Sequence, residues 1–149
     1  MSETNRGYAQ VVGIAARPTA AWRAFTEEPM LVRWYAAAAR VDPHLGGTFW
    51  VRLRDGRERN AVIDVWEVGR RLRLVYFPTP GLPAPPDGAP LTEDVLFDIR
   101  PGRTLVRVLG ANVPDTPEWV PEYLRLRMGW AYWLNQLKKL LETPAELAG

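Results

Sequence analysis

Residues 123–142 show a helical periodicity of apolar and polar positions. When these residues are placed at about 100° intervals around a helix axis, the apolar side chains gather in a sector of about 120°. This sector holds Tyr123, Leu126, Trp130, Trp133, Leu134, Leu137, Leu140 and Leu141, and the other side carries Arg125, Arg127, Asn135, Lys138 and Lys139. Pro121 suits a first turn, where no backbone N–H needs a partner. The pattern predicts one long amphipathic helix with a tryptophan-rich apolar face.

Most of the chain before this helix shows the period-two alternation of strands. Tyr8, Gln10, Val12 and Ile14 share one face of the first predicted strand. The predicted strands cover residues 8–16, 48–53, 60–68, 72–76, 92–99 and 104–110, and turn-forming pairs such as Asp55-Gly56 separate them. Consecutive strands with short turns form antiparallel sheets, because parallel neighbours need long crossovers. We therefore expect an α+β fold in which a curved antiparallel sheet of about six strands wraps around the C-terminal helix.

Two short helices are predicted between the first strand and the rest of the sheet. Pro18 has a backbone angle suited to a first helical turn, and an alanine-rich segment with two aromatic residues follows it. Glu28-Pro29 ends this helix, because the residue before proline is disfavoured in the α region. A second helix covers residues 30–35, and residues 36–40 are compatible with its extension.

Residues 78–90 form a different kind of segment. They contain six of the fourteen prolines of the chain and show no periodicity, which predicts a loop. The segment is longer than an ordinary hairpin connection. We therefore expect it to act as a lid at the mouth of a cavity.

The composition fits one globular domain spanning residues 1–149, with 47% hydrophobic and 24% charged residues. No apolar run reaches the ~18 residues of a membrane span, and the N-terminal residues lack a signal-peptide core, so a cytoplasmic protein is expected. The absence of Cys excludes disulfides and thiolate nucleophiles. A single His44 disfavours a His-built metal site, and we expect neither a metal nor a cofactor.

The basic residues do not indicate nucleic-acid binding, although the pI is about 9.2. The formal net charge is only +2, and no nucleic-acid-binding motif is present. The arginines alternate with apolar or acidic neighbours, as solvent-facing strand positions do. They are Arg52, Arg54, Arg57 and Arg59, then Arg70, Arg71 and Arg73, then Arg100, Arg103 and Arg107.

Several stretches, taken in order, resemble the SRPBCC superfamily, and most closely its branch similar to the C-terminal domain of the heat-shock protein ninety ATPase activator. They are residues 16–26, 31–35, 46–49 before Asp55-Gly56, Arg71-Leu72, and Gly129-Trp130 with Leu134, Leu137 and Leu141. The resemblance implies the START-like helix-grip fold with a hydrophobic pocket between sheet and helix. It also implies a range of functions: lipid or polyketide binding, cyclase-like chemistry, antibiotic resistance by self-sacrifice, and co-chaperone activity.

The candidate ligand-binding residues are the large side chains expected to face this space. They are Trp34, Tyr35, Phe49, Tyr76, Phe97, Tyr123, Leu126, Trp130 and Trp133. Aromatic stripes at helical spacing also form ordinary packed cores, so both interpretations stay open. Glu93 has the parity of Val95 and Phe97 and is a candidate inward carboxylate. Arg52 and Arg107 are candidate inward cations.

The leading hypothesis is the binding of a small hydrophobic or aromatic molecule, lipid-like or polyketide-like, in this cavity. One alternative is a cyclase-, dehydratase- or hydrolase-like enzyme in which Glu93 or Tyr76 assists proton transfer. A second alternative is a co-chaperone-like interaction module, which predicts a filled cavity and an exposed apolar patch.

Trp119, Met128 and Tyr132 lie off the main apolar sector and suggest a second covered face or a homodimer contact. No membrane or nucleic-acid partner is expected.

Overall fold

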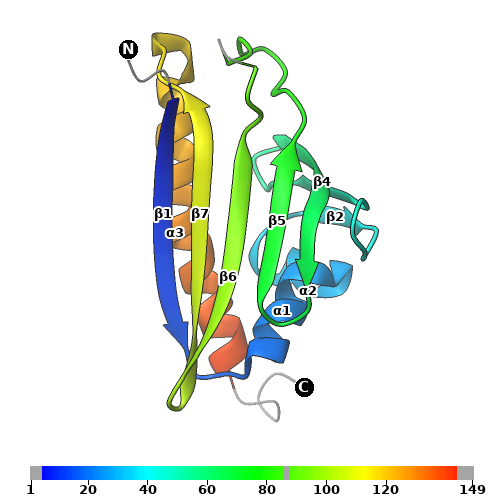
Figure 1. Cartoon of the computed structure of the whole chain (residues 1–149). Coiled ribbons are helices and arrows are strands. Elements are labelled where there is room, and N and C mark those ends of the chain that lie inside the picture. Colours follow the sequence, from blue (N-terminus) through cyan, green and yellow to red (C-terminus); the bar gives the residue numbers. More distant parts are fainter. Residues whose placement is uncertain (1–4, 86–87, 144–149) are drawn as a thin grey trace.

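The computed structural model describes residues 5–85 and 88–143. Its seven strands form one antiparallel sheet in the order β1-β7-β6-β5-β4-β3-β2. The elements along the chain are β1 (Asn5–Ile14), α1 (Pro18–Thr26), α2 (Glu28–Trp34), β2 (Ala38–Val41), β3 (Thr48–Arg52), β4 (Glu58–Glu67), β5 (Arg71–Tyr76), β6 (Thr92–Arg100), β7 (Arg103–Pro114), a 3₁₀ turn η1 (Pro117–Trp119) and α3 (Val120–Glu142). Figure 1 shows the helices on one side of the sheet. The predicted helix-grip architecture is confirmed.

The main difference from the predicted elements is the strand β2. Residues 36–40 do not extend α2, which ends at Trp34. Ala38–Val41 instead pairs with β3, and the backbone N–H of Ala37 donates to Arg52 at 2.8 Å. The alanine run favours a helix only weakly, whereas β3 offers a row of backbone donors and acceptors at its edge. Pairing with β3 therefore outweighs local propensity.

The helix α3 packs along β1, and in Figure 1 it runs behind β1 and β7. Its buried face contains Leu126, Trp130, Leu134 and Leu137, as the periodicity predicts. Polar contacts also join it to β1 along the length of the strand. The Tyr123 hydroxyl donates to the Gly7 carbonyl at 3.0 Å, and Lys138 donates to the Gly13 carbonyl at 3.0 Å.

Aromatic rings occupy the space between the sheet and α3. Trp130 stacks on Tyr35 with ring centroids 5.0 Å apart, and Trp133 meets Trp130 edge to face at 5.2 Å. Phe25 packs on Trp34 at 4.8 Å. Among the described residues, no helix has the length and apolarity needed to cross a membrane.

Candidate functional site

A buried carboxylate, Glu93, lies at the centre of a polar network inside this aromatic core. Glu93 is completely inaccessible to solvent. Arg59 donates to both of its oxygens, at 3.1 and 2.9 Å. The Tyr76 hydroxyl and the Trp130 indole N–H each donate to it at 2.7 Å, and the Tyr8 hydroxyl donates to Oε2. Glu93 therefore faces inward, as its parity with Val95 predicted, and both oxygens are engaged by protein donors.

The register of the sheet explains how Tyr8 reaches Glu93 across an intervening strand. Gly110 of β7 lies opposite Tyr8 of β1 on one side and opposite Glu93 of β6 on the other. A Cβ atom at Gly110 would overlap the Tyr8 ring. Because Gly110 has no side chain, the phenol lies over β7 and its hydroxyl meets the carboxylate. The glycine is thus a requirement of the network.

Arg59 is the inward-facing cation, whereas Arg52 and Arg107, which were predicted to face inward, face outward. Arg59 is 8% exposed, although its sequence cluster was expected to face solvent. Arg52 is exposed, and Arg107 points outward and pairs with Asp98 at 2.8 Å. Both alternate with inward-facing neighbours, so their own positions face out. The ion pair with Glu93 supplies the compensation that a buried guanidinium needs.

Two further contacts hold the Arg59 guanidinium. It donates to the Tyr35 hydroxyl at 2.8 Å and lies over the Tyr76 ring, 4.3 Å from the centroid. The side chain thus joins β4 to Tyr35 at the end of α2 and to β5. Both tyrosines were candidate ligand-binding residues, and in the structure their hydroxyls belong to this network.

The network keeps Glu93 ionised and its tyrosines protonated. Burial alone would raise the pKa of Glu93. The positive charge of Arg59 and the hydrogen bonds from Arg59, Tyr76 and Tyr8 have a larger opposite effect, so the pKa of Glu93 is lowered. Burial raises the pKa of Tyr35 to about 12. Burial, together with the Glu93 charge, also raises the pKa of Tyr8 and Tyr76. The arrangement suits fixed hydrogen bonding better than proton transfer at neutral pH.

A pocket of about 290 Å³ lies next to this network, under the proline-rich segment. This loop pocket is lined by residues 76–79, 82–85 and 88–91, with Asn112, Pro114 and Trp119. The Trp119 indole donates to the Pro83 carbonyl at 2.8 Å, and the Asn112 amide donates to the Pro90 carbonyl at 3.0 Å. These bonds attach the segment to the end of β7 and to η1. Residues 86–87 of the predicted lid lie outside the described residues.

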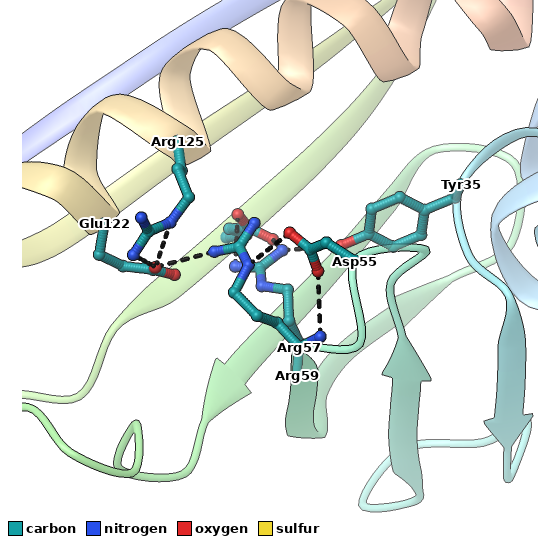
Figure 2. Close-up of polar contacts among 7 residues, drawn as sticks. Tyr35, Asp55, Arg57, Arg59, Glu122 and Arg125 are labelled. Carbon is teal, nitrogen blue, oxygen red and sulfur yellow. Dashed lines mark hydrogen bonds and ion pairs between the residues drawn. The ribbon is translucent and has the colours of Figure 1, made fainter.

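A second, more polar hollow opens beside the loop pocket. This arginine groove, of about 560 Å³, is lined by residues 56–59, 79–82, Glu122 and Arg125. Figure 2 shows Arg57 between Asp55, at 2.8 Å, and Glu122 of α3, at 2.9 Å. Arg125 also pairs with Glu122, at 3.1 Å. A connecting pocket of about 200 Å³, lined by residues 58–60, 76–80, Leu91 and Glu122, shares lining residues with both hollows.

The nine predicted ligand-binding residues divide into three groups. Tyr76 lines the loop pocket and the connecting pocket. Tyr35 and Trp133 line a separate hollow of about 260 Å³ with Tyr132. The others belong to the aromatic core or its edge: Trp34, Phe49, Phe97, Leu126 and Trp130 are buried, and Tyr123 is partly buried. Ligand binding by these nine residues stays a prediction.

Sequence reasoning missed Arg59, Tyr8, Asn112 and Trp119 as parts of these sites. Arg59 shares the parity of the buried Ala61 and Ile63, which was the available signal. Asn112 has a positive φ of 69°, which the sequence alone does not reveal. The described residues contain no cluster of three or more His, Asp or Glu side chains suited to a metal ion.

The sheet order and the long helix that covers it define a helix-grip protein of the START-like (SRPBCC) type. The model of the family described as "Activator of Hsp90 ATPase homolog 1-like protein" matches residues 15–142, and the chain belongs to that family. No curated protein matches the sequence.

Solved structures share this fold at low sequence identity. Protein MLL2253 from Mesorhizobium loti has a TM-score of 0.78 and 19% identity, over 92% of this chain and 97% of that chain. The Aha1 dimer from Colwellia psychrerythraea has a TM-score of 0.78 and 18% identity, over 92% and 96% of the two chains. CalU16 from Micromonospora echinospora has a TM-score of 0.72 and 19% identity, over 97% and 80%.

Proposed function

We propose that the protein binds a small hydrophobic or aromatic molecule in the loop pocket. The observation that carries this proposal is an apolar hollow of about 290 Å³, close to the lower limit of ordinary ligand sites, walled by proline, leucine, phenylalanine and tryptophan. The superfamily fold is compatible with this role. The binding site lies beside the space between sheet and α3, because aromatic rings fill that space.

The geometry favours binding over catalysis by Glu93. A general base needs a free lone pair near the proton that it accepts, and a general acid needs a proton. Glu93 accepts five hydrogen bonds from protein groups and is kept ionised by Arg59. The Tyr76 hydroxyl, the other candidate, donates a hydrogen bond to Glu93, and its pKa is raised, so it keeps its proton. Both groups therefore act as fixed members of the buried network.

The proposal is tested by filling the pocket. Leu91 lines the loop pocket and is partly buried, so Leu91→Trp adds bulk to it. Leu140→Trp is the matched control, because Leu140 is also partly buried but lies near the C-terminal end of α3. Thermal shift and calorimetry with fatty acids, flavonoids and polyketides should identify a compound that binds the wild type and Leu140→Trp, but binds Leu91→Trp at least tenfold more weakly. Equal binding to both variants would refute this location.

A protein-interaction role is the second candidate function, because an apolar stripe lies on the outer face of α3. Val120, Leu124, Met128 and Tyr132 follow one another at intervals of four residues, and Met128 is 71% exposed. Neighbouring Arg125 is already paired with Glu122, so the stripe can meet a like surface with little charge repulsion. We propose that it pairs with a second copy of this chain. The similar Colwellia protein is a dimer, which supports the proposal.

Light scattering coupled to size exclusion tests this pairing. The wild type should have the mass of a dimer, and Met128→Glu should have the mass of a monomer. Val68→Glu places the same charge on an exposed apolar residue at the β4–β5 turn and should remain dimeric. A monomeric wild type at high micromolar concentration would contradict the proposal.

A further inference from the structure

We infer that the ligand of the loop pocket is a neutral amphipathic molecule whose carbonyl oxygen is received by Arg59. Ketones, esters and amides attached to an apolar body belong to this class. The inference rests on the proposed binding function and adds to it a polar subsite and a charge preference.

The first step is that the three hollows lie side by side and share lining residues. Thr79 lines all of them, and Leu82 lines both the loop pocket and the arginine groove. The connecting pocket shares Tyr76 and Leu91 with the loop pocket, and Arg59 with the arginine groove. A ligand whose apolar body lies under the proline-rich segment can therefore extend a substituent to the guanidinium of Arg59.

The second step is the hydrogen-bonding capacity of Arg59. A guanidinium has five N–H donors. Within the described residues, Arg59 gives three of them to Tyr35 and Glu93. The Arg59 side chain is 7% exposed and lines the connecting pocket, so its other donors can meet a ligand oxygen there. An oxygen acceptor placed there makes a charge-assisted hydrogen bond that a hydrocarbon cannot make.

The third step is the charge balance, which selects against an anion. Each guanidinium of the groove already has a carboxylate partner: Arg59 pairs with Glu93, Arg125 with Glu122, and Arg57 with both Asp55 and Glu122 (Figure 2). Glu58 adds another carboxylate to the wall. A ligand carboxylate would bring an additional negative charge and find no uncompensated positive charge. A neutral carbonyl uses the remaining donors without this penalty.

The experiment compares three probes with the same naphthalene body. These are 2-acetylnaphthalene, 2-naphthoate, which is anionic at pH 7, and 2-ethylnaphthalene, which has no acceptor. Calorimetry on the full chain at pH 7 should show that the ketone binds about tenfold more tightly than the hydrocarbon, as expected for a hydrogen bond to a charged donor. The carboxylate should bind more weakly than the ketone.

Two variants test the assignment to these residues. Arg59→Lys keeps a positive charge but loses the planar fork of donors, so the preference for the ketone over the hydrocarbon should fall to twofold or less. Its thermal unfolding curve shows whether it remains folded. Glu122→Gln removes one carboxylate from the rim of the groove, where its side chain is 12% exposed. It should shift the preference between ketone and carboxylate toward the carboxylate by about fivefold or more, and it does not alter the buried pair.

The outcomes separate this inference from the proposed function. Equal binding of all three probes would overturn the polar subsite and leave an apolar binding pocket. Tightest binding of 2-naphthoate would also overturn it, because the site would then be anion-selective. Failure of every probe and of the wider ligand panel would refute the binding function, and the inference with it.

Discussion

The Glu93 carboxylate accepts five hydrogen bonds from four side chains that come from β1, β4, β5 and α3. We predict that Glu93→Gln destabilises the fold by about 3–5 kcal/mol, because Arg59 is left as a buried charge without compensation. Urea unfolding measures the change. Asp98→Asn, at the exposed pair with Arg107, is the control and should change stability by less than about 1 kcal/mol. If Glu93→Gln changed stability as little as Asp98→Asn does, the network around Glu93 would not stabilise the fold.

The buried tyrosines predict a loss of stability at high pH. Burial raises the pKa of Tyr35 from an ordinary value of 10.0 to about 12. The folded state therefore holds the phenol proton more tightly than the unfolded state does. Its contribution is complete below pH 10 and is lost as the pH rises toward 12, by about 3 kcal/mol for Tyr35 alone.

Denaturant unfolding at pH 9 to 11.5 measures this loss. Tyr35→Phe should reduce the slope of stability against pH in this range. Tyr132→Phe should leave the slope as in the wild type, because Tyr132 is 57% exposed. A slope that is the same in all three proteins would contradict the assignment to Tyr35.

At the level of single residues, sequence patterns identified Glu93 but not its partner. Alternation along one strand placed Glu93 on the same face as Val95 and Phe97. The same rule places Arg59 with Ala61 and Ile63, but an arginine on a strand is ordinarily exposed. Its burial is favourable only because of a carboxylate 34 residues away in sequence, on a strand that is not its neighbour in the sheet. A local pattern does not contain that information.

Among the elements, β7 contains Gly110, which leaves room for the Tyr8 ring to reach Glu93. Gly110→Ala should cost about 1–3 kcal/mol, because its methyl group overlaps the Tyr8 ring and displaces the hydroxyl from Glu93. Gly13→Ala is the matched control on β1. A Cβ there would meet only the flexible side chains of Leu105 and Arg103, at 3.4 and 3.5 Å.

Chemical unfolding and a double-mutant cycle measure the Gly110 effect. In a Tyr8→Ala background the methyl group has no ring to displace, so Gly110→Ala should cost much less than in the wild type. If Gly110→Ala lowers stability equally in both backgrounds, its cost does not come from the Tyr8 ring. The placement of Tyr8 over Gly110 would then be wrong.

Long, regular elements were predictable from the sequence, whereas short ones depended on their neighbours. The apolar face of α3 spans many helical turns, so its periodicity overrides local exceptions. The four-residue strand β2 has no such repeat and forms because β3 offers an edge. The composition of residues 78–90 predicted a loop. The attachment of this loop through Trp119 and Asn112 depends on contacts distant in sequence.

Across the whole molecule, the fold encloses a filled aromatic core, and the loop pocket, the connecting pocket and the arginine groove lie together at one end. The tryptophan stripe of α3 packs on Tyr35, Phe25 and Trp34. These three hollows lie where the start of β4, the ends of β5 and β7 and the start of α3 meet the proline-rich segment. Binding at this end, as proposed, would leave the aromatic core intact.

The N-terminal strand completes this architecture, and its removal gives a test of how the parts depend on one another. β1 pairs with β7 from Asn5–Pro114 to Ile14–Thr104, and it brings Tyr8 and Ile14 into the core. It also receives the hydrogen bonds from Tyr123 and Lys138 that hold α3. Residues 90 to 125 positions apart must therefore meet before the sheet and helix are stable.

We predict that a chain starting at Ala16 does not unfold cooperatively at any temperature, because α3 and β7 lose their shared partner. Adding a synthetic peptide of residues 5–15 should restore a cooperative transition by pairing with the free edge of β7. A peptide with Tyr8→Phe should restore it at least tenfold less effectively, because Glu93 loses one donor. Circular dichroism melts against peptide concentration measure both effects. A cooperative melt of the shortened chain alone would show that β1 is dispensable, and the network would then be complete without Tyr8.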